Sequence, residues 1–580
     1  MDSLFFSEIL KNNNILNSKI KDKPKIEVKV LSNITLNQFK PIVEYSLNTH
    51  EIFISVKVGE YDNIIKESCE INNEIPIIFW ELSNLSDGFV FEIENFNEDK
   101  IKLFKDKVFN DIDLLFLNLE KCKTVIFNKF SHLGFSYNLY KKSKFQNFVE
   151  DVNQYLENNL PENFEIIDID KPIATCSIIK TFNFRNFYNN KSLYSVDFFK
   201  SYSNFIHPVL RGISGKTKKC IVLDCDNTLW SGIIGEDGPN DVKFDISDLG
   251  EGKYFYFVNE ILKSLQNNGI ILCLASKNNY SDVEHFFSIN KKRLSLNFED
   301  FIVKKINWES KHENIKEIAK ELNIGLDSFV FIDDSDFEIN LIKSFSPEIS
   351  TFQVPKNIFE YPHLLINIKN LFYNKIGTEE DLNRNKMYHE NIKRNSIKKK
   401  SLNIDDYIKS LNIEIEISEN NFNEVERLSQ LTQKTNQFNL STKRYEIVEI
   451  KSFLEKNNST VFSINVKDMF GKLGTTGLCI VIFEKNTAII DTFLMSCRIL
   501  GRKIEHSFMK ELFDRIIDTN PSIDTLIARY IPSEKNSPIK SFLNTIESSK
   551  TEMKDGMVEF AFTKPIIINN KIHKIVWKNN

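Results

Sequence analysis

The chain has 580 residues and a net charge of −5, from 75 Lys and Arg against 80 Asp and Glu. This length predicts three or four domains with sizeable cores, and the near balance of charge argues against a nucleic-acid-binding protein, which usually carries a basic face. Eight cysteines without a C-x-x-C pair speak against a disulfide framework or a structural zinc site. Since no apolar run approaches the roughly 20 residues that span a bilayer, we expect no membrane partner and a cytoplasmic location.

Residues 1–211 alternate strand-like apolar runs with polar helical stretches, which predicts an N-terminal α/β domain. The strand-like runs are IEVKVLS, IFISVKV, PIIFWEL, LLFLNL and TVIFNKF. Ser32 ends the first of them, but no Asp-x-x-His motif that could supply a base occurs late in the segment. Without a base the hydroxyl is not activated, so we expect a binding or architectural role for this domain. Residues 212–220 form a short linker.

The central segment, 219–370, repeats the strand–helix rhythm and places polar residues after four predicted strands, CIVLD, GIILCLAS, FIVKK and SFVFIDD. Ligands of an open parallel sheet bind at the carboxyl ends of its strands, so we expect these polar residues to meet. Each feature alone is common in turns and helix caps, but four in order indicate a phosphoryl-transfer site. The residues are, in chain order, Asp224, Ser276 with Asn278, Lys311, and Asp333 with Asp334.

The residue types explain the chemistry. Asp224 can attack phosphorus and form an aspartyl-phosphate, and Asp226, on the same side of an extended chain, can protonate the leaving oxygen and then activate water. Mg²⁺ prefers oxygen ligands and would relieve the repulsion between the carboxylates. Lys311 balances their negative charge. The expected metal ligands are Asp224, Asp226 through its carbonyl, Asp334 and Asp333; the expected phosphate contacts are Ser276, Lys311, Thr228 and Asn278.

Residues 376–402 are highly charged and predict a helix and linker, and 403–580 predict a third α/β or α+β unit. The stretch RLSQLTQKTNQFNLSTKRY favours an amphipathic helix followed by a polar loop, or alternatively a pocket for a carrier or acyl group that includes Asn436 and Gln437.

Further along, Arg498-x-x-Gly501-Arg502 lies between a strand-like run and an amphipathic helix. Gly501 would let the backbone approach a ligand, while the helix N-terminus and the basic side chains attract an anion. Such an arrangement suits the pyrophosphate of coenzyme A or the phosphopantetheine of a carrier protein.

DCDNT, LASKN, NWESK and FIDDSDFE resemble the haloacid dehalogenase (HAD) phosphatase superfamily, and LDCDNTLWSGIIGEDG resembles its class IIIC FkbH-like proteins. The resemblance implies Asp224 as nucleophile, Asp226 as general acid and base, and the other motif residues at the phosphate and the metal. One departure is Ser231, where the family usually has glycine between Trp and Gly. We expect it to alter the flap after the catalytic pair more than the chemistry.

TNQFNLSTKRY and MSCRILGR are similar to the acetyltransferase-like (GNAT-like) C-terminal part of FkbH-type proteins. This group is associated with loading a glyceryl unit from a phosphorylated glycerate, such as 1,3-bisphosphoglycerate, onto an acyl carrier protein. By that resemblance Arg498, Gly501 and Arg502 contact the carrier or CoA. Cys497 would hold the acyl group as a thioester, or is a small buried cysteine at a strand end. A second departure, DMFGKLG at 468–474 for the family's Asp-Arg-Phe-Gly-Asp-x-Gly, bears on acyl specificity.

The sequence thus predicts an α/β protein, in which a HAD-type Rossmann-like parallel sheet is flanked by an N-terminal SGNH-like α/β domain and a C-terminal GNAT-like α+β domain. The expected function is a Mg²⁺-dependent phosphatase for a small phosphorylated acid, combined with acyl loading. One alternative is a stand-alone phosphatase for a sugar or lipid phosphate. Another is a binding protein on an inactive fold, against which the intact Asp224, Asp226, Lys311 and Asp334 argue.

Overall fold

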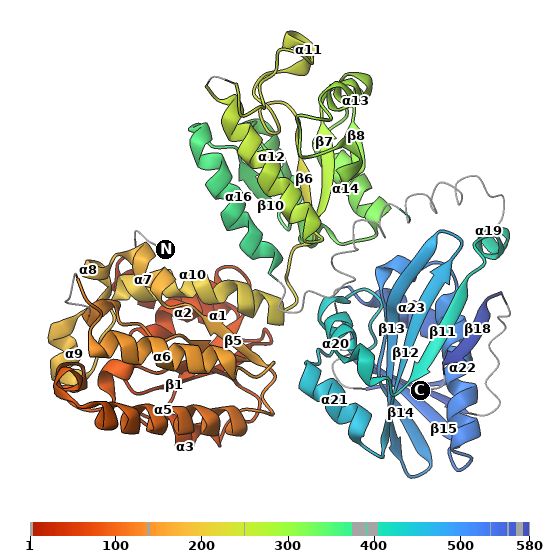
Figure 1. The fold of residues 1–580 in the computed structure, drawn as a ribbon. Coiled ribbons are helices and arrows are strands. Elements are labelled where there is room, and N and C mark those ends of the chain that lie inside the picture. The colour runs from red at the N-terminus through yellow and green to blue at the C-terminus, as the bar shows by residue number, and fades with distance from the viewer. Residues whose placement is uncertain are drawn as a thin grey trace. The chain divides into compact units, whose positions relative to one another are not determined.

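The computed structural model (Figure 1) describes residues 4–135, 140–248, 250–373, 390, 404–533, 535–553, 556–563 and 572–578. The chain divides into two compact units, Met1–Ser214 with Glu446–Glu449, and Gly215–Tyr445 with Ile450–Asn580. The first unit contains a parallel sheet, and the second contains a parallel sheet and a mixed one. This confirms the predicted fold class. The predicted helix and linker at 376–402 lies outside the described residues except for Glu390, and the predicted domain boundaries stay predictions.

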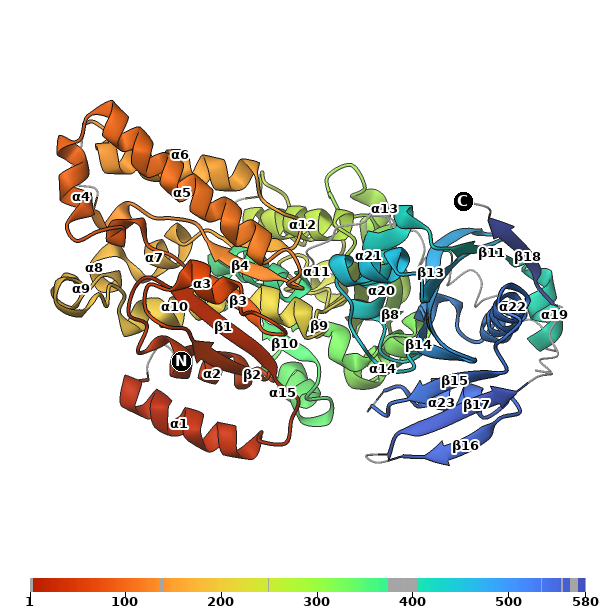
Figure 2. The ribbon, with the colours of Figure 1, turned by 90° about the horizontal axis from the view of Figure 1, so that it is seen from below.

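The N-terminal sheet has the strand order β2-β1-β3-β4-β5, all parallel. Helices cover both faces: α5 and α6 lie on one side, and α1 and α2 on the other (Figure 2). Because both faces are covered, β3 and β4 are buried along their whole length and read as continuous apolar runs. The strands are β1 (Ile26–Ser32), β2 (Ile54–Val58), β3 (Ile75–Phe79), β4 (Val125–Asn128) and β5 (Phe164–Ile167). The helices are α1 (Phe6–Lys19), α2 (Phe39–Asn48), α3 (Ile64–Ser68), α4 (Phe89–Glu92), α5 (Glu98–Asn118), α6 (Lys144–Asn158), α7 (Asp170–Cys176), α8 (Ile178–Thr181), α9 (Phe184–Asn190) and α10 (Val196–Ile213).

The predicted strand at LLFLNL is wrong, because this run forms the C-terminal end of α5. Asn97 caps the helix by accepting a hydrogen bond from the Lys100 N–H. The buried side chains recur at helical spacing, whereas Leu114 and Leu117 remain exposed. The helical spacing of apolar residues in α5 becomes visible only in a sequence window longer than the six residues LLFLNL. The strand that the sequence reading missed is β5. The buried positions of α5 are Ile101, Val108, Ile112 and Leu115.

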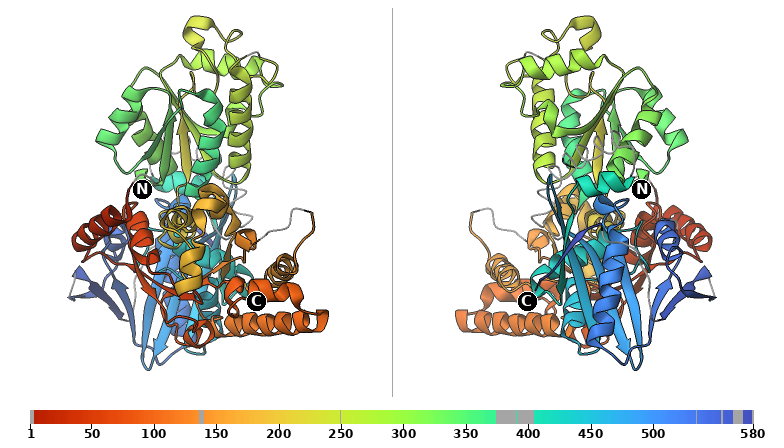
Figure 3. Two further views of the ribbon diagram at one scale, coloured as in Figure 1. Left: turned by 90° about the vertical axis from the view of Figure 1, so that its left-hand side faces the viewer. Right: turned by 90° about the vertical axis from the view of Figure 1, so that its right-hand side faces the viewer.

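The second parallel sheet has the order β10-β9-β6-β7-β8, so β6 lies at its centre. Helices pack on both faces (Figure 3), and successive residues of β6 contribute alternately to the two apolar cores. The carboxyl end of β6 therefore lies at the centre of the row formed by the carboxyl ends of the five strands. The strands are β6 (Cys220–Leu223), β7 (Ile271–Ser276), β8 (Phe301–Ile306), β9 (Phe329–Asp333) and β10 (Ser350–Gln353). The helices are α11 (Ile234–Asp237), α12 (Gly252–Asn267), α13 (Tyr280–Ile289), α14 (Lys311–Leu322), α15 (Asp336–Phe345) and α16 (Tyr361–Lys369).

The C-terminal sheet has the order β16-β17-β15-β14-β13-β12-β11-β18. Its pairs are antiparallel except β14 with β15 and β11 with β18. The strands are β11 (Glu414–Glu419), β12 (Ser459–Asp468), β13 (Gly471–Glu484), β14 (Thr487–Met495), β15 (Thr525–Tyr530), β16 (Ser549–Glu552), β17 (Val558–Thr563) and β18 (Lys574–Lys578). The helices are α19 (Ile404–Ser410), α20 (Val425–Lys434), α21 (Ile447–Glu455), α22 (Ile504–Thr519) and α23 (Ser537–Leu543).

β14 and β15 pair over the first part of β14, Thr487 to Ile490. Beyond it, the polar loop after α20 runs along β14: the Leu440 N–H donates to the Phe493 carbonyl (2.9 Å) and the Met495 N–H to the Phe438 carbonyl (3.0 Å). The loop that carries Asn436 and Gln437 is thereby fixed beside the end of β14, where the Arg498 segment begins.

Candidate active site

Two neighbouring strands bring three aspartates together. Asp224 follows β6 directly, Asp333 ends β9, and Asp334 comes next. Because β6 and β9 pair in parallel, their carboxyl ends meet at the same edge, and the Asp224 N–H donates to the Ile332 carbonyl (3.1 Å). One carboxylate oxygen from each of Asp224, Asp333 and Asp334 lies within 4.8 Å of the others. The predicted meeting of these motifs at one sheet edge is thus seen in the structure.

Lys311, the first residue of α14, lies between two of these carboxylates. Its Nζ is 3.1 Å from Asp224 Oδ2 and 2.6 Å from Asp333 Oδ2, and the residue is buried. Burial alone would lower the pKa of Lys311, but the two carboxylates raise it well above its usual range. Burial, together with the Asp224 charge, raises the pKa of Asp333 to about 7 against the opposing effect of Lys311. The lysine therefore stays charged and compensates part of the acidic cluster.

The aspartate cluster fits a hard cation. Asp224 Oδ1 is buried and has no hydrogen-bond partner within the described ranges, and such an atom costs free energy unless a cation or donor reaches it. Asp333 is already engaged, since Oδ2 faces Lys311 and Oδ1 accepts the Ser335 N–H (2.9 Å). All candidate ligand atoms are oxygens, which Mg²⁺ prefers. Asp224 and Asp334 are consequently the better candidate ligands.

Asp226 lies near this cluster, but its carboxylate is held separately. Oδ1 accepts hydrogen bonds from Trp230 Nε1 (2.9 Å) and the Ile234 N–H (3.1 Å), and Oδ2 accepts one from Asn278 Nδ2 (2.8 Å). Burial raises the pKa of Asp226, and these three donors oppose the rise. The carboxyl group is thus fixed in orientation by three donors. The predicted metal contact through its backbone carbonyl stays a prediction.

Two of the predicted phosphate-binding residues, Ser276 at the end of β7 and Asn278 just after it, are linked to Asp226 by hydrogen bonds. Asn278 Nδ2 donates to Ser276 Oγ (3.2 Å) as well as to Asp226. Thr228 is fully buried, and its Oγ1 has no hydrogen-bond partner in the described part of the chain. Buried hydroxyls are nearly always satisfied in folded proteins, so the unpaired Thr228 hydroxyl marks a place where a ligand oxygen can bind.

Sequence reasoning missed two residues that position this site. Asn227 adopts a left-handed backbone (φ 51°), which asparagine tolerates better than most residues. Its side-chain oxygen accepts the Gly232 N–H (3.0 Å). Burial raises the pKa of Asp334, and the Asn227 side chain lowers it. Trp230 is the second, through its bond to Asp226. Both stand in LDCDNTLW, but nothing in the chain order indicates which carboxylate each one contacts.

The Ser231 substitution is accommodated without strain. Its N–H and carbonyl pair with Lys243 across an isolated antiparallel bridge, and it is not among the residues with positive φ, in contrast to Gly232 (φ 108°). Position 231 therefore does not require glycine. Its hydroxyl donates to Glu251 Oε2 (3.1 Å) at the exposed flap surface.

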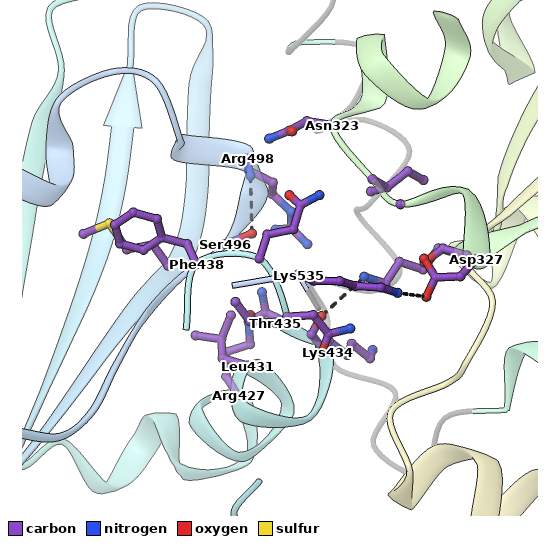
Figure 4. Close-up of a pocket in the computed structure, with 17 residues that line it drawn as sticks. Asn323, Asp327, Arg427, Leu431, Lys434, Thr435, Phe438, Ser496, Arg498 and Lys535 are labelled. Atoms are coloured by element: carbon purple, nitrogen blue, oxygen red, sulfur yellow. Dashed lines mark hydrogen bonds and ion pairs between the residues drawn. The ribbon is translucent and has the colours of Figure 1, made fainter. Parts of the chain in front are cut away.

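In the C-terminal domain the structure brings together three of the predicted acyl-binding residues. Asn436, Gln437 and Arg498 line a cavity of about 90 Å³ (Figure 4). Other residues line the same cavity, among them Arg427, Lys434, Ser496 and, from the preceding domain of the same unit, Asp327.

The remaining predicted acyl-binding residues are placed differently. Arg502 is buried, with its guanidinium 3.9 Å from the fully buried carboxylate of Asp468, so it belongs to an interior ion pair. Gly501 has φ 76° and open space where a Cβ would lie, so glycine here serves the backbone turn. The Cys497 backbone lies in a short 3₁₀ helix (Cys497–Ile499), and its side chain is outside the described part of the structure.

Ser32 is held in its own turn. Its buried Oγ donates to the Ile34 carbonyl and accepts the Ile34 N–H, both at 3.0 Å. These bonds agree with the expectation of a binding or architectural role for the domain, which stays a prediction. Across the described ranges, no helix is long and apolar enough to cross a membrane.

Comparison with known proteins gives a structural likeness and no sequence family. Protein-family models do not match the chain, and neither do curated proteins. Among solved structures, the chain is similar to the N-terminal part of the protein BF1531 from Bacteroides fragilis, which contains a phosphatase domain complexed with Mg. That similarity has 25% identity and a TM-score of 0.55, and covers 64% of this chain and 100% of the other. The chain thus shares the fold of a protein that contains a phosphatase domain.

Weaker likenesses involve about a quarter of the chain. The ribosomal-protein-S18-alanine N-acetyltransferase from Escherichia coli matches 27% of this chain and 97% of its own, with 10% identity and a TM-score of 0.20. The N-acetyltransferase PseH from Campylobacter jejuni matches 26% of this chain and 98% of its own, with 9% identity and a TM-score of 0.18.

Proposed function

We propose that the chain is an FkbH-like, Mg²⁺-dependent phosphatase of the HAD superfamily that cleaves a small phosphorylated acid through an aspartyl-phosphate on Asp224. The observation that carries the proposal is the cluster of Asp224, Asp333 and Asp334 around Lys311, with a buried Asp224 oxygen that lacks a protein partner. The similarity to a phosphatase domain complexed with Mg supports the choice of metal.

Asp224 and Asp334 would hold the Mg²⁺, together with the Asp226 carbonyl, while Asp333 would orient Lys311. When bound, Mg²⁺ neutralises negative charge and polarises the phosphoryl oxygens. The protein's own contribution is to place the nucleophile beside a charged lysine, since the Lys311 Nζ lies 3.1 Å from the carboxylate.

In the first step an Asp224 oxygen bonds to phosphorus as the bond from phosphorus to the leaving oxygen breaks, and Asp226 gives its proton to that oxygen. In the second step water attacks the phosphorus of the aspartyl-phosphate, Asp226 takes a proton from this water, and phosphate leaves with the Asp224 carboxylate restored. A carboxyl group with a raised pKa suits both transfers. Lys311, Ser276 and Thr228 would contact the phosphoryl oxygens, where charge stabilisation provides most of the rate.

We further propose that the C-terminal domain binds an acyl group carried by CoA or by the phosphopantetheine of a carrier protein. Support comes from the cavity lined by Asn436, Gln437 and Arg498, and from the backbone bonds that fix this loop along β14. The guanidinium of Arg498 suits a phosphate group of such a carrier. Cys497 would hold the acyl group as a thioester during transfer.

The test is one incubation with two measurements. The protein is mixed with MgCl₂, 1,3-bisphosphoglycerate and a phosphopantetheinylated carrier protein; free phosphate is assayed and the carrier is weighed by mass spectrometry. We expect phosphate release and a glyceryl adduct on the carrier. Phosphate release without an adduct on any carrier or on CoA would reduce the function to the phosphatase alone. The absence of phosphate release from this substrate and from a broad panel of phosphomonoesters would contradict the proposal.

A further inference from the structure

The N-terminal domain contains a cavity of about 500 Å³ that the phosphatase chemistry does not use. It is lined by residues that follow β1, β2 and β3 and by α5. In the strand order β2-β1-β3-β4-β5, the chain passes from β1 to β2 on one side and then crosses to β3 on the other side of β1. The carboxyl ends of β1 and β3 therefore form a topological switch point of the sheet. Ligands of open α/β sheets bind at such points, and the volume is that of a small-molecule site, roughly 300–1,000 Å³.

Two almost fully buried side chains present unpaired polar atoms on the cavity wall. Trp80, which follows β3, is 7% exposed, and within the described ranges its indole N–H has no hydrogen-bond partner. Asn84 is 9% exposed; its Nδ2 donates to the Asn33 carbonyl (2.6 Å) and to Tyr61 Oη (3.1 Å), while its Oδ1 is unpaired among the described residues. Because both residues line the cavity, a ligand that offers an acceptor and a donor can pair with these two atoms.

The charged groups of the cavity almost cancel. Partial desolvation raises the pKa of the Asp62 and Asp111 carboxyls, and the nearby positive charge of Lys107 opposes this rise. In the described chain no ion pair within 4.0 Å joins Lys107 to either aspartate, so all three side chains can still take a ligand. Lys66 adds a second positive charge. Two carboxylates disfavour an anion and two lysines disfavour a cation. The apolar part of the wall consists of Ile64, Ile65, Leu85, Phe104 and Val108, and Asn33, Asn63 and Cys69 also line the cavity.

We propose that this cavity binds a small uncharged hydroxylated ring, of the monosaccharide type. A hydroxyl both donates and accepts, so one ring can donate to Asp62 and Asp111 and accept from Lys107 and the Trp80 N–H. The carbon face of the ring would cover the apolar wall. Ser32 takes no part, because its hydroxyl is occupied in its own turn. The site is independent of the phosphatase centre, and no phosphate on the ligand is required.

The experiment measures binding of unphosphorylated sugars to the full chain by saturation-transfer difference NMR and isothermal titration. The probes are glucose, galactose, mannose and N-acetylglucosamine, with adenosine and inorganic phosphate as comparisons. We expect at least one sugar to bind, and to bind equally well to Asp224→Asn, which disables the proposed phosphatase site. Asp111→Asn and Trp80→Phe should each weaken binding about tenfold, the usual effect of losing one hydrogen bond to a charged or buried group.

Asp106→Asn is the matched control, because Asp106 is exposed on the same helix and does not line the cavity. It should leave the affinity unchanged, and circular dichroism should show all variants folded. The proposal is overturned if no sugar binds, if Asp111→Asn and Trp80→Phe bind as tightly as the control, or if adenosine or phosphate binds this cavity in place of sugars.

Discussion

The substitution Asp224→Asn should abolish phosphate release and yet stabilise the metal-free protein. Asp224 shares the cluster with two other carboxylates within 4.8 Å and with one lysine at 3.1 Å. At about pH 9, where Asp333 is ionised because its pKa is about 7, and at an effective dielectric constant of about 20, the two repulsions sum to roughly 7 kcal/mol and the attraction to Lys311 is roughly 5 kcal/mol. Removing the charge therefore relieves about 2 kcal/mol. For a domain of this size that corresponds to a melting temperature higher by about 4–8 °C.

With Mg²⁺ bound, the wild type should become more stable than Asp224→Asn. At a concentration of 100 times its dissociation constant, a bound ion stabilises the wild type by about 2.7 kcal/mol, and the variant, which lacks a central ligand, should gain little. We expect the two melting curves to cross as MgCl₂ is added, with phosphatase activity lost by about 10³-fold or more. Scanning calorimetry with and without MgCl₂ and a phosphate assay measure both effects.

Asp336→Asn provides the matched control. Asp336 lies two residues beyond Asp334 and is exposed in the first turn of α15, so the same change of charge is made outside the cluster. The control should keep both its activity and its response to Mg²⁺. The reasoning would be refuted if Asp224→Asn melted below the wild type without Mg²⁺, if Mg²⁺ still stabilised it fully, or if it kept its activity.

Three further predictions concern other parts of the chain. Burial raises the pKa of the Glu81 carboxyl from 4.5 to about 8 in the folded protein. The protonated carboxyl therefore stabilises the fold at acidic pH, and this stabilisation is lost as the pH rises from about 4.5 toward 8. Glu81→Gln should therefore be more stable than the wild type at pH 8, by on the order of 3–5 kcal/mol in urea unfolding, and no more stable at pH 4.5; a gain equal at both pH values would contradict this. Trp230→Phe removes a 2.9 Å donor to Asp226, so kcat should fall about tenfold with Mg²⁺ affinity unchanged, and an unaltered kcat would exclude the positioning role. Arg498→Gln should lower carrier acylation while phosphate release persists, whereas Arg529→Gln, on β15 and outside the cavity, should change neither; equal losses in both variants would speak against a carrier site.

Much of the proposed phosphatase centre could be predicted from the sequence. Strands covered on both faces read as continuous apolar runs, and a polar residue at the end of such a run has to lie at the sheet edge. CIVLD, GIILCLAS and SFVFIDD therefore located Asp224, Ser276 and Asp333 correctly at the carboxyl ends of β6, β7 and β9. The same local logic failed at LLFLNL, because a short apolar run does not distinguish a strand from the end of a long helix.

The tertiary structure decided which of these groups contact one another. Three contacts depend on how the strands and helices pack. Lys311 pairs with Asp333 as well as with Asp224. Asp226 accepts hydrogen bonds from Trp230 and Asn278, and Arg502 lies in an interior ion pair. The cavity at the carboxyl ends of β1 and β3 likewise follows from strand order. The sequence by itself determined which residue types end the strands, because burial acts on each segment locally. Only the packed fold determined their partners, since those bonds join residues many positions apart and depend on distances that chain order does not specify.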